Sequence, residues 1–185
     1  LLRLLSFFKR EKMRIKLHFF SGGREVGEGD NSDIIKCWRK RKEFEVCGRL
    51  DKNFRIVVCK VGERHHCDVH EMLSASERKK GVYNFHTHHT PVGVPSLGDR
   101  LAIYGYNEPE VIVGTEEAYL YSPADKNKAE RYSFEELQEM EKKIYESFLH
   151  KFRDEEDPET LAYFATDAYF EREFPLTKQR VYVSV

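Results

Sequence analysis

The sequence predicts an α/β (α+β) fold, with a central mixed β-sheet flanked by helices and a C-terminal helical extension. Over residues 13–125, short apolar runs typical of strands alternate with polar or helical segments. Over 126–185, two apolar stripes at spacings of three and four predict long helices. With 185 residues the chain suffices for one well-buried domain and is short for two. We therefore expect a tail or helix over 1–12, one domain over 13–125, and an extension over 126–185 packed on that domain.

Charge and hydrophobicity exclude several classes of protein. The 31 Lys and Arg against 32 Asp and Glu give a net charge of −1, so no basic field favours nucleic acid as a partner. Hydrophobic residues make up 40% of the chain and aromatic residues 13%, enough for a packed core. No segment approaches the ~20 apolar residues of a membrane span. We expect a globular protein without a membrane anchor.

The cysteines and the N-terminus bear on the compartment. None of the four cysteines forms a CxxC pair, which predicts free, mostly buried thiols in a reducing compartment: Cys37, Cys47, Cys59 and Cys67. The first residues are apolar, but basic residues follow them instead of preceding them as in a signal peptide. Both observations predict a cytoplasmic protein. Whether the true start is Leu1 or Met13 stays open.

The elements of the first half follow from periodicity and turn residues. Residues 14–20 alternate like a strand, and the glycine-rich segment 21–29 predicts a turn. A helix is expected over 33–42 with three apolar residues inward: Ile34, Ile35 and Trp38. Its basic run, 39–42, is either a solvated last turn or a docking patch for an acidic partner.

Two apolar segments, 44–50 and 54–61, predict a hairpin joined at 51–53. The segment that follows gathers three histidines and a cysteine: His65, His66, Cys67 and His70. Clustered His and Cys can bind metal, although this spacing matches no closed four-ligand pattern. A second metal site and a substrate-facing loop therefore both remain open. A helix or turn is expected over 74–80.

The second half predicts a helix over 100–106, a buried strand at 111–113 and a hairpin partner at 118–121. A capping box at Ser133 starts a helix that runs to about Arg153, and Asp157 with Pro158 starts a second helix. The apolar stripe of that second helix is expected to be Leu161, Phe164, Ala165, Ala168 and Tyr169. Alternating valines at 181, 183 and 185 predict a last strand.

The chemistry concentrates after a predicted strand at 82–85. His86 and His88 are two residues apart, so their side chains point to the same side of an extended strand. A proline- and glycine-rich loop then leads to Asp99. Two imidazoles and a carboxylate are ligands that Zn²⁺ accepts, and a catalytic zinc keeps its fourth position for water. We expect one catalytic Zn²⁺ here.

The spacing His-x-His, seven residues, Ser, two residues, Asp resembles that of the JAMM (MPN+) metalloprotease family. It is met at His86, His88, Ser96 and Asp99. Upstream, residues 45–50 resemble the family's Glu-x-x-Gly-x-Leu segment. The resemblance covers roughly residues 33–122, and His89 departs from it where many members have a proline.

The resemblance implies a cytidine-deaminase-like core and a catalytic domain over 13–125. It implies that Glu45 is the general base acting on the metal-activated water, and that Ser96 donates a hydrogen bond to the oxyanion. Glu63 is a rival candidate for the base, because it lies closer in sequence to the histidines but in a polar loop.

The implied substrates are conjugates of a ubiquitin-like modifier or of a sulfur-carrier protein, cleaved by a zinc isopeptidase. Two alternatives stay open. One is a non-catalytic MPN-type scaffold, and the other is a metal-dependent amidohydrolase that acts on a small-molecule or peptide amide. The sequence also leaves a homo-oligomer open.

Overall fold

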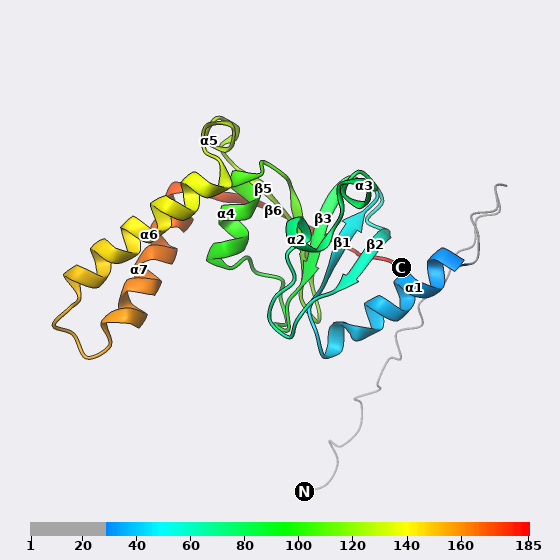
Figure 1. Cartoon of the computed structure of the whole chain (residues 1–185), viewed down its shortest axis with the longest axis horizontal. Coiled ribbons are helices and arrows are strands. Elements are labelled where there is room, and N and C mark those ends of the chain that lie inside the picture. The colour runs from blue at the N-terminus through cyan, green and yellow to red at the C-terminus, as the bar shows by residue number, and fades with distance from the viewer. Residues whose placement is uncertain (1–28) are drawn as a thin grey trace, which may run out of the picture.

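The computed structural model describes residues 29–185, in which one mixed sheet has the strand order β2-β1-β3-β4-β5-β6 (Figure 1). The strands are β1 Val46–Leu50, β2 Ile56–Val61, β3 Tyr83–Thr87, β4 Glu110–Val113, β5 Ala118–Pro123 and β6 Leu176–Val181. β3 and β4 run parallel, and the other neighbours are antiparallel. The predicted mixed sheet with helices is confirmed, while the expectations for residues 1–28 lie outside the described residues.

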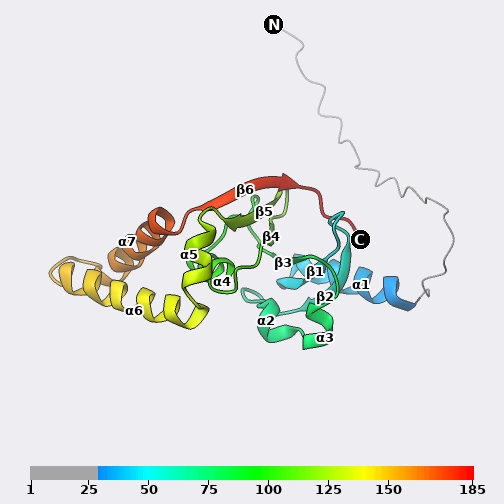
Figure 2. The ribbon, with the colours of Figure 1, turned by 90° about the horizontal axis from the view of Figure 1, so that it is seen from above.

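Helices lie at both ends of the molecule and also alongside the strands between them (Figures 1 and 2). They are α1 Gly29–Arg39, α2 Val69–Met72, α3 Ala75–Arg78, α4 Leu97–Gly105, α5 Lys126–Arg131, α6 Phe134–Lys151 and α7 Pro158–Glu173. α1 packs on β2, whereas α6 and α7 pair with each other beyond α4. The short helices α2 and α5 have no counterpart in the prediction. Among the described residues, no helix combines the length and apolar character needed to cross a membrane.

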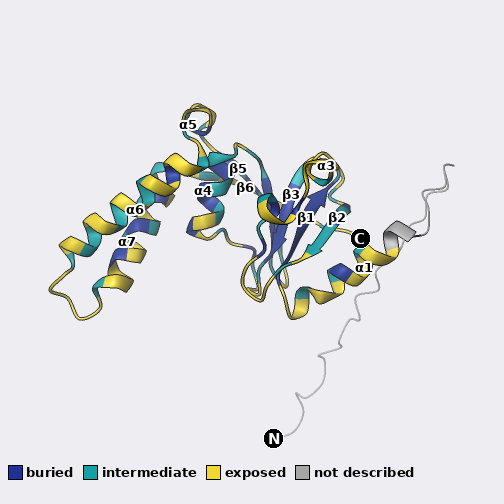
Figure 3. Ribbon diagram, in the orientation of Figure 1, coloured by how far each residue is buried: buried dark blue, intermediate teal, exposed yellow. Residues whose placement is uncertain are grey.

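The core is concentrated on the central strands (Figure 3). One cluster joins the strands and α1 through residues such as Val46, Leu50 and Phe85. A second cluster joins α4 to the helical pair through Leu101 and Leu137, among others. The carboxyl end of β3 and the amino end of α4 are therefore both anchored to buried packing, which positions the residues they carry.

The C-terminal segment belongs to the sheet as well as to the helical pair. β6 pairs with β5 over its whole length, from Leu176 opposite Pro123 to Val181 opposite Ala118. Beyond it, the Ser184 amide donates to the Phe54 carbonyl (3.1 Å), and the Ile56 amide donates to the Ser184 carbonyl (2.9 Å). β6 therefore ends at Val181, whereas the alternating valines at 181, 183 and 185 predicted a strand that begins there. Pairing with β5 determines which residues form the strand.

Two helices bury faces that differ from the predicted ones. Ile35 in α1 is 39% exposed, and Cys37 is buried instead. In α7 the buried residues are Ala162, Thr166 and Phe170, whereas Leu161 and Phe164 of the predicted stripe are exposed. α7 carries apolar residues on more than one side, so helical period alone cannot choose the buried side. The packing of α7 against α6 and α4 makes that choice.

The expectation of free thiols is wrong, because the four cysteines form two disulfides. Cys37 in α1 pairs with Cys59 in β2, and Cys47 in β1 pairs with Cys67 ahead of α2. The partners are 22 and 20 residues apart, so sequence spacing alone does not reveal these pairings. Since stable disulfides are typical of oxidising compartments, the cysteines no longer support a cytoplasmic location.

Gly48 of the Glu-x-x-Gly-x-Leu segment has a steric role. A Cβ atom at this position would collide with the Val58 carbonyl and come within 3.0 Å of the Phe85 ring. We expect Gly48→Ala to lower the free energy of unfolding by about 3 kcal/mol, measured by urea denaturation. The Val58 backbone and the buried Phe85 ring cannot move aside without disturbing the packing around them. Gly98→Ala is the matched control, since its Cβ would meet only Ser96 Oγ at 3.7 Å. Equal stability of the two variants would contradict this expectation.

Candidate metal centre

Two elements bring the predicted ligands together. His86 lies within β3 and His88 directly follows this strand, where its amide donates to the Val113 carbonyl (2.8 Å). Asp99 lies in the first turn of α4, and a capping box holds it there. Ser96 Oγ accepts from the Asp99 amide (3.2 Å), and the Ser96 amide donates to Asp99 Oδ2 (2.7 Å). The helix start therefore orients this carboxylate.

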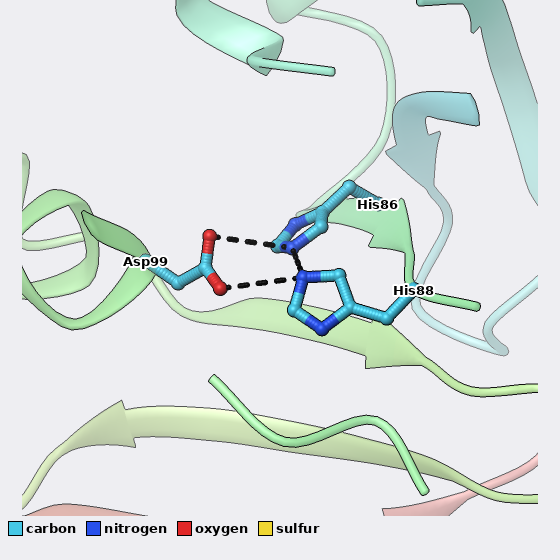
Figure 4. Close-up of side chains that lie close together, drawn as sticks. All are labelled: His86, His88 and Asp99. Carbon is cyan, nitrogen blue, oxygen red and sulfur yellow. Dashed lines mark hydrogen bonds and ion pairs between the residues drawn. The ribbon is translucent and has the colours of Figure 1, made fainter. Parts of the chain in front are cut away.

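The three side chains converge from β3 and α4 (Figure 4). The two Nε2 atoms of His86 and His88 are 2.9 Å apart. Asp99 Oδ1 lies 3.3 Å from His86 Nε2, and Asp99 Oδ2 lies 3.4 Å from His88 Nε2. Two imidazole nitrogens and a carboxylate oxygen that lie this close together form a donor set that Zn²⁺ accepts. Among the residues whose side chains the structure describes, 32–185, this is the one group of His, Cys, Asp and Glu close enough to hold a metal ion.

Charge and burial shift the pKa values of two of these groups strongly. Burial alone would lower the pKa of His86, but the carboxylates of Asp99 and Glu110 outweigh it and raise this pKa well above its usual value. Burial would likewise raise the pKa of Asp99, but His86 and His88 hold it well below its usual value. Without a metal, a proton on His86 therefore supplies the positive charge that the carboxylates favour.

His86 and Asp99 together make the stability of the metal-free protein depend on pH. The pKa of His86 is raised in the folded state, so its contribution is complete below pH 6.5 and is lost as pH rises through the raised value. The pKa of Asp99 is depressed, so its contribution is complete above pH 3.8 and is lost as pH falls through the lowered value. We expect chelator-treated protein to lose stability above pH 6.5 in urea unfolding measured over a pH series. His86→Gln should flatten this loss; an unchanged pH profile in that variant would contradict the assignment.

Glu45 is the carboxylate best placed to act beside the ligands. It immediately precedes β1, where its amide donates to the Glu63 carbonyl (2.8 Å) and extends the β1–β2 pairing. The residue is 9% exposed, and it lines a cleft of about 690 Å³ together with the three candidate ligands. Burial raises the pKa of Glu45, and the nearby histidines only partly offset this rise. The rival Glu63 is exposed and does not line the cleft.

Ser96 also lines the cleft, at the start of α4. Its hydroxyl donates to Asp99 Oδ2 at 2.8 Å and accepts from the Asp99 amide. In this arrangement Ser96 supports the ligand carboxylate. Donation to an oxyanion would require the hydroxyl to rotate away from Asp99, so this role stays a prediction.

The histidine-rich segment 65–70 forms one wall of the cleft and no metal group of its own. Cys67 forms a disulfide with Cys47, so its sulfur cannot bind a metal ion. His66 Nε2 lies 3.2 Å from Glu71 Oε2. The His70 ring stacks on Tyr106, with centroids 3.6 Å apart. These contacts argue against a second metal site and leave the segment as a loop that lines the cleft.

The sequence did not indicate two contributions to the site. Phe134 and Gln138 of α6 line the cleft, although they lie in the C-terminal third of the chain. Glu110 at the start of β4 accepts from His86 Nδ1 at 2.9 Å. A charged residue that opens a buried apolar strand, Val111–Val113, is the signal that could have drawn attention to Glu110.

Together, the fold and the site define a mixed α/β protein with a candidate divalent-metal centre at the end of β3. Neither the protein-family models nor the curated proteins with which the chain was compared match it.

Proposed function

We propose that the protein is a zinc-dependent isopeptidase or peptidase of the JAMM type. The observation that carries the proposal is the convergence of His86, His88 and Asp99 beside a cleft that also holds Glu45. Three protein ligands leave the fourth position of a zinc ion open for water, which is typical of catalytic zinc sites. Structural zinc sites have four protein ligands and no open position. A scaffold without chemistry would have no need for a buried carboxylate beside this position.

A zinc ion held by these residues supplies a Lewis acid that polarises a carbonyl and lowers the pKa of water to about 7. Glu45 accepts the proton of the attacking water and passes it to the departing amine. Its raised pKa suits both steps, because a general acid–base group works best with a pKa near the working pH.

The lining of the cleft suits an uncharged amide. It includes no Lys or Arg to hold a phosphate or a free carboxylate, whereas Glu45, Asp68, Glu71 and Glu110 lie beside its six histidines. The amide between a modifier's C-terminus and a lysine needs no such cationic side chain. The resemblance to the JAMM family favours ubiquitin-like or sulfur-carrier conjugates. A homo-oligomer stays a prediction from the sequence. A cytoplasmic location also stays a prediction, but the two disulfides have removed the support that the cysteines gave it.

The test compares two substrates with zinc-loaded protein: a ubiquitin-like modifier joined to lysine by an isopeptide bond, and a short peptide amide. We expect cleavage of the conjugate that stops with chelator and returns with added zinc. Cleavage of the short peptide alone would favour the amidohydrolase. A protein that binds no zinc at neutral pH would favour the scaffold and overturn the proposal.

A further inference from the structure

A buried carboxylate lies behind the first ligand histidine. Glu110 Oε1 is 2.9 Å from His86 Nδ1, the ring nitrogen that points away from His88 and Asp99. His86 is 4% exposed and Glu110 is 9% exposed, so little water competes for this contact. The parallel pairing of β3 with β4, with His86 opposite Ile112, holds both residues on neighbouring strands.

This contact favours a proton on Nδ1 of the ring, because Glu110 at 2.9 Å from Nδ1 is nearer than Asp99 at 3.3 Å from Nε2. An ionised carboxylate only accepts hydrogen bonds, so the Nδ1 atom of His86 must donate. In a neutral imidazole with a proton on Nδ1, the lone pair is on Nε2. Nε2 is the atom that faces His88 Nε2 at 2.9 Å and Asp99 Oδ1 at 3.3 Å. The contact therefore directs a metal-binding lone pair into the site.

We propose that Glu110 is a positioning residue that keeps His86 in the Nδ1-protonated tautomer, with Nε2 directed at the metal ion. This inference rests on the proposed zinc site and adds a residue to it. Glu110 lies on the far side of the ring from the ion, so it does not touch the reacting atoms, and Glu45 keeps the acid–base role. Carboxylates behind ligand histidines fix the ring orientation and raise its basicity.

His88 differs from His86 in this respect. Within the described residues its Nδ1 atom has no carboxylate partner, and its side chain is 18% exposed. The two ligands are therefore unequal: His86 is held from behind on a buried strand, and His88 lies at the open side. Loss of the contact behind His86 should weaken metal binding without removing a ligand.

The experiment measures zinc affinity by competition with a chelator in Glu110→Ala and Glu110→Gln. We expect Glu110→Ala to bind zinc about 10–100-fold more weakly, the usual cost of losing such a partner. Glu110→Gln retains an acceptor oxygen for Nδ1 and should recover most of the affinity. Glu108→Gln is the matched control, because Glu108 contacts Asn84 and no ligand. Unchanged zinc affinity in Glu110→Ala would overturn the inference.

A second measurement separates this inference from the zinc site itself. The ring nitrogens of His86 are observed by nitrogen-15 NMR in the metal-free protein at alkaline pH. A preference for Nδ1–H in the wild type that is lost in Glu110→Ala and kept in Glu110→Gln supports the role of Glu110. The same tautomer in all three proteins overturns it. Failure of wild-type protein to bind zinc would instead overturn the proposed function. Thermal unfolding of each variant identifies any general loss of stability.

Discussion

Replacing Asp99 with alanine is expected to reduce bound zinc from one ion per chain to none. Asp99 supplies the only carboxylate among the three converging ligands, and two imidazoles alone leave the ion without charge compensation. Activity should fall about 1000-fold or more, because a bound cation contributes several kcal/mol to transition-state stabilisation. Elemental analysis of dialysed protein measures the first effect, and cleavage of the modifier conjugate measures the second.

Asp99 is also the N3 residue of the capping box of α4, whose N-cap is Ser96, so a loss of zinc must be separated from a loss of fold. Its carboxylate accepts from the Ser96 amide, and an alanine would remove that hydrogen bond. Asp125→Ala removes a comparable cap, since Asp125 Oδ1 accepts from the Lys128 amide at the start of α5. Both variants should lose about 1 kcal/mol of stability, but only Asp99→Ala should lose zinc. Zinc bound at wild-type stoichiometry in Asp99→Ala would show that the ligand assignment is wrong.

The second large effect is expected from Glu45→Gln, which should keep zinc and lose activity. Glutamine matches glutamate in shape but cannot accept a proton, so the hydrolysis rate should fall by about 10²–10⁴-fold. Glu45 is not among the group that can hold the ion, so zinc content should stay at the wild-type value. Metal analysis and conjugate cleavage on the same preparation give both readings.

Glu63→Gln is the matched control for this variant. Glu63 is the rival base from the sequence, but it is exposed and outside the cleft, so its replacement should leave the rate near that of wild type. The opposite pattern, with activity lost in Glu63→Gln and kept in Glu45→Gln, would transfer the acid–base role to Glu63. A loss of zinc in Glu45→Gln would argue that Glu45 is a ligand.

Much of the site could be predicted because its parts depend on local geometry. His88 continues the pairing of β3 with β4 by one residue, so it points to the same side as His86, as the side-chain period of two of an extended segment requires. The Ser96–Asp99 pair is a capping box, so its spacing of three residues follows from the first turn of a helix. The hairpin of β1 and β2 and the start of α6 are local in the same sense.

Contacts between distant segments could not be read in this way. Glu110 reaches His86 only because β4 pairs in parallel with β3, 24 residues away. The disulfides and the buried side of α7 likewise depend on which elements pack together. Residue type and spacing along the chain do not indicate which distant segments will contact one another.

By itself, the amino-acid sequence determined the strand and helix segments around the candidate site and the positions of the three candidate ligands along the chain. Side-chain direction within a strand or a first helical turn follows from backbone geometry over a few residues. Only the tertiary structure decided that Glu45, rather than Glu63, shares the cleft with the ligands and that Glu110 lies behind His86. These positions depend on the pairing of strands far apart in the chain, and packing of the whole sheet selects that pairing.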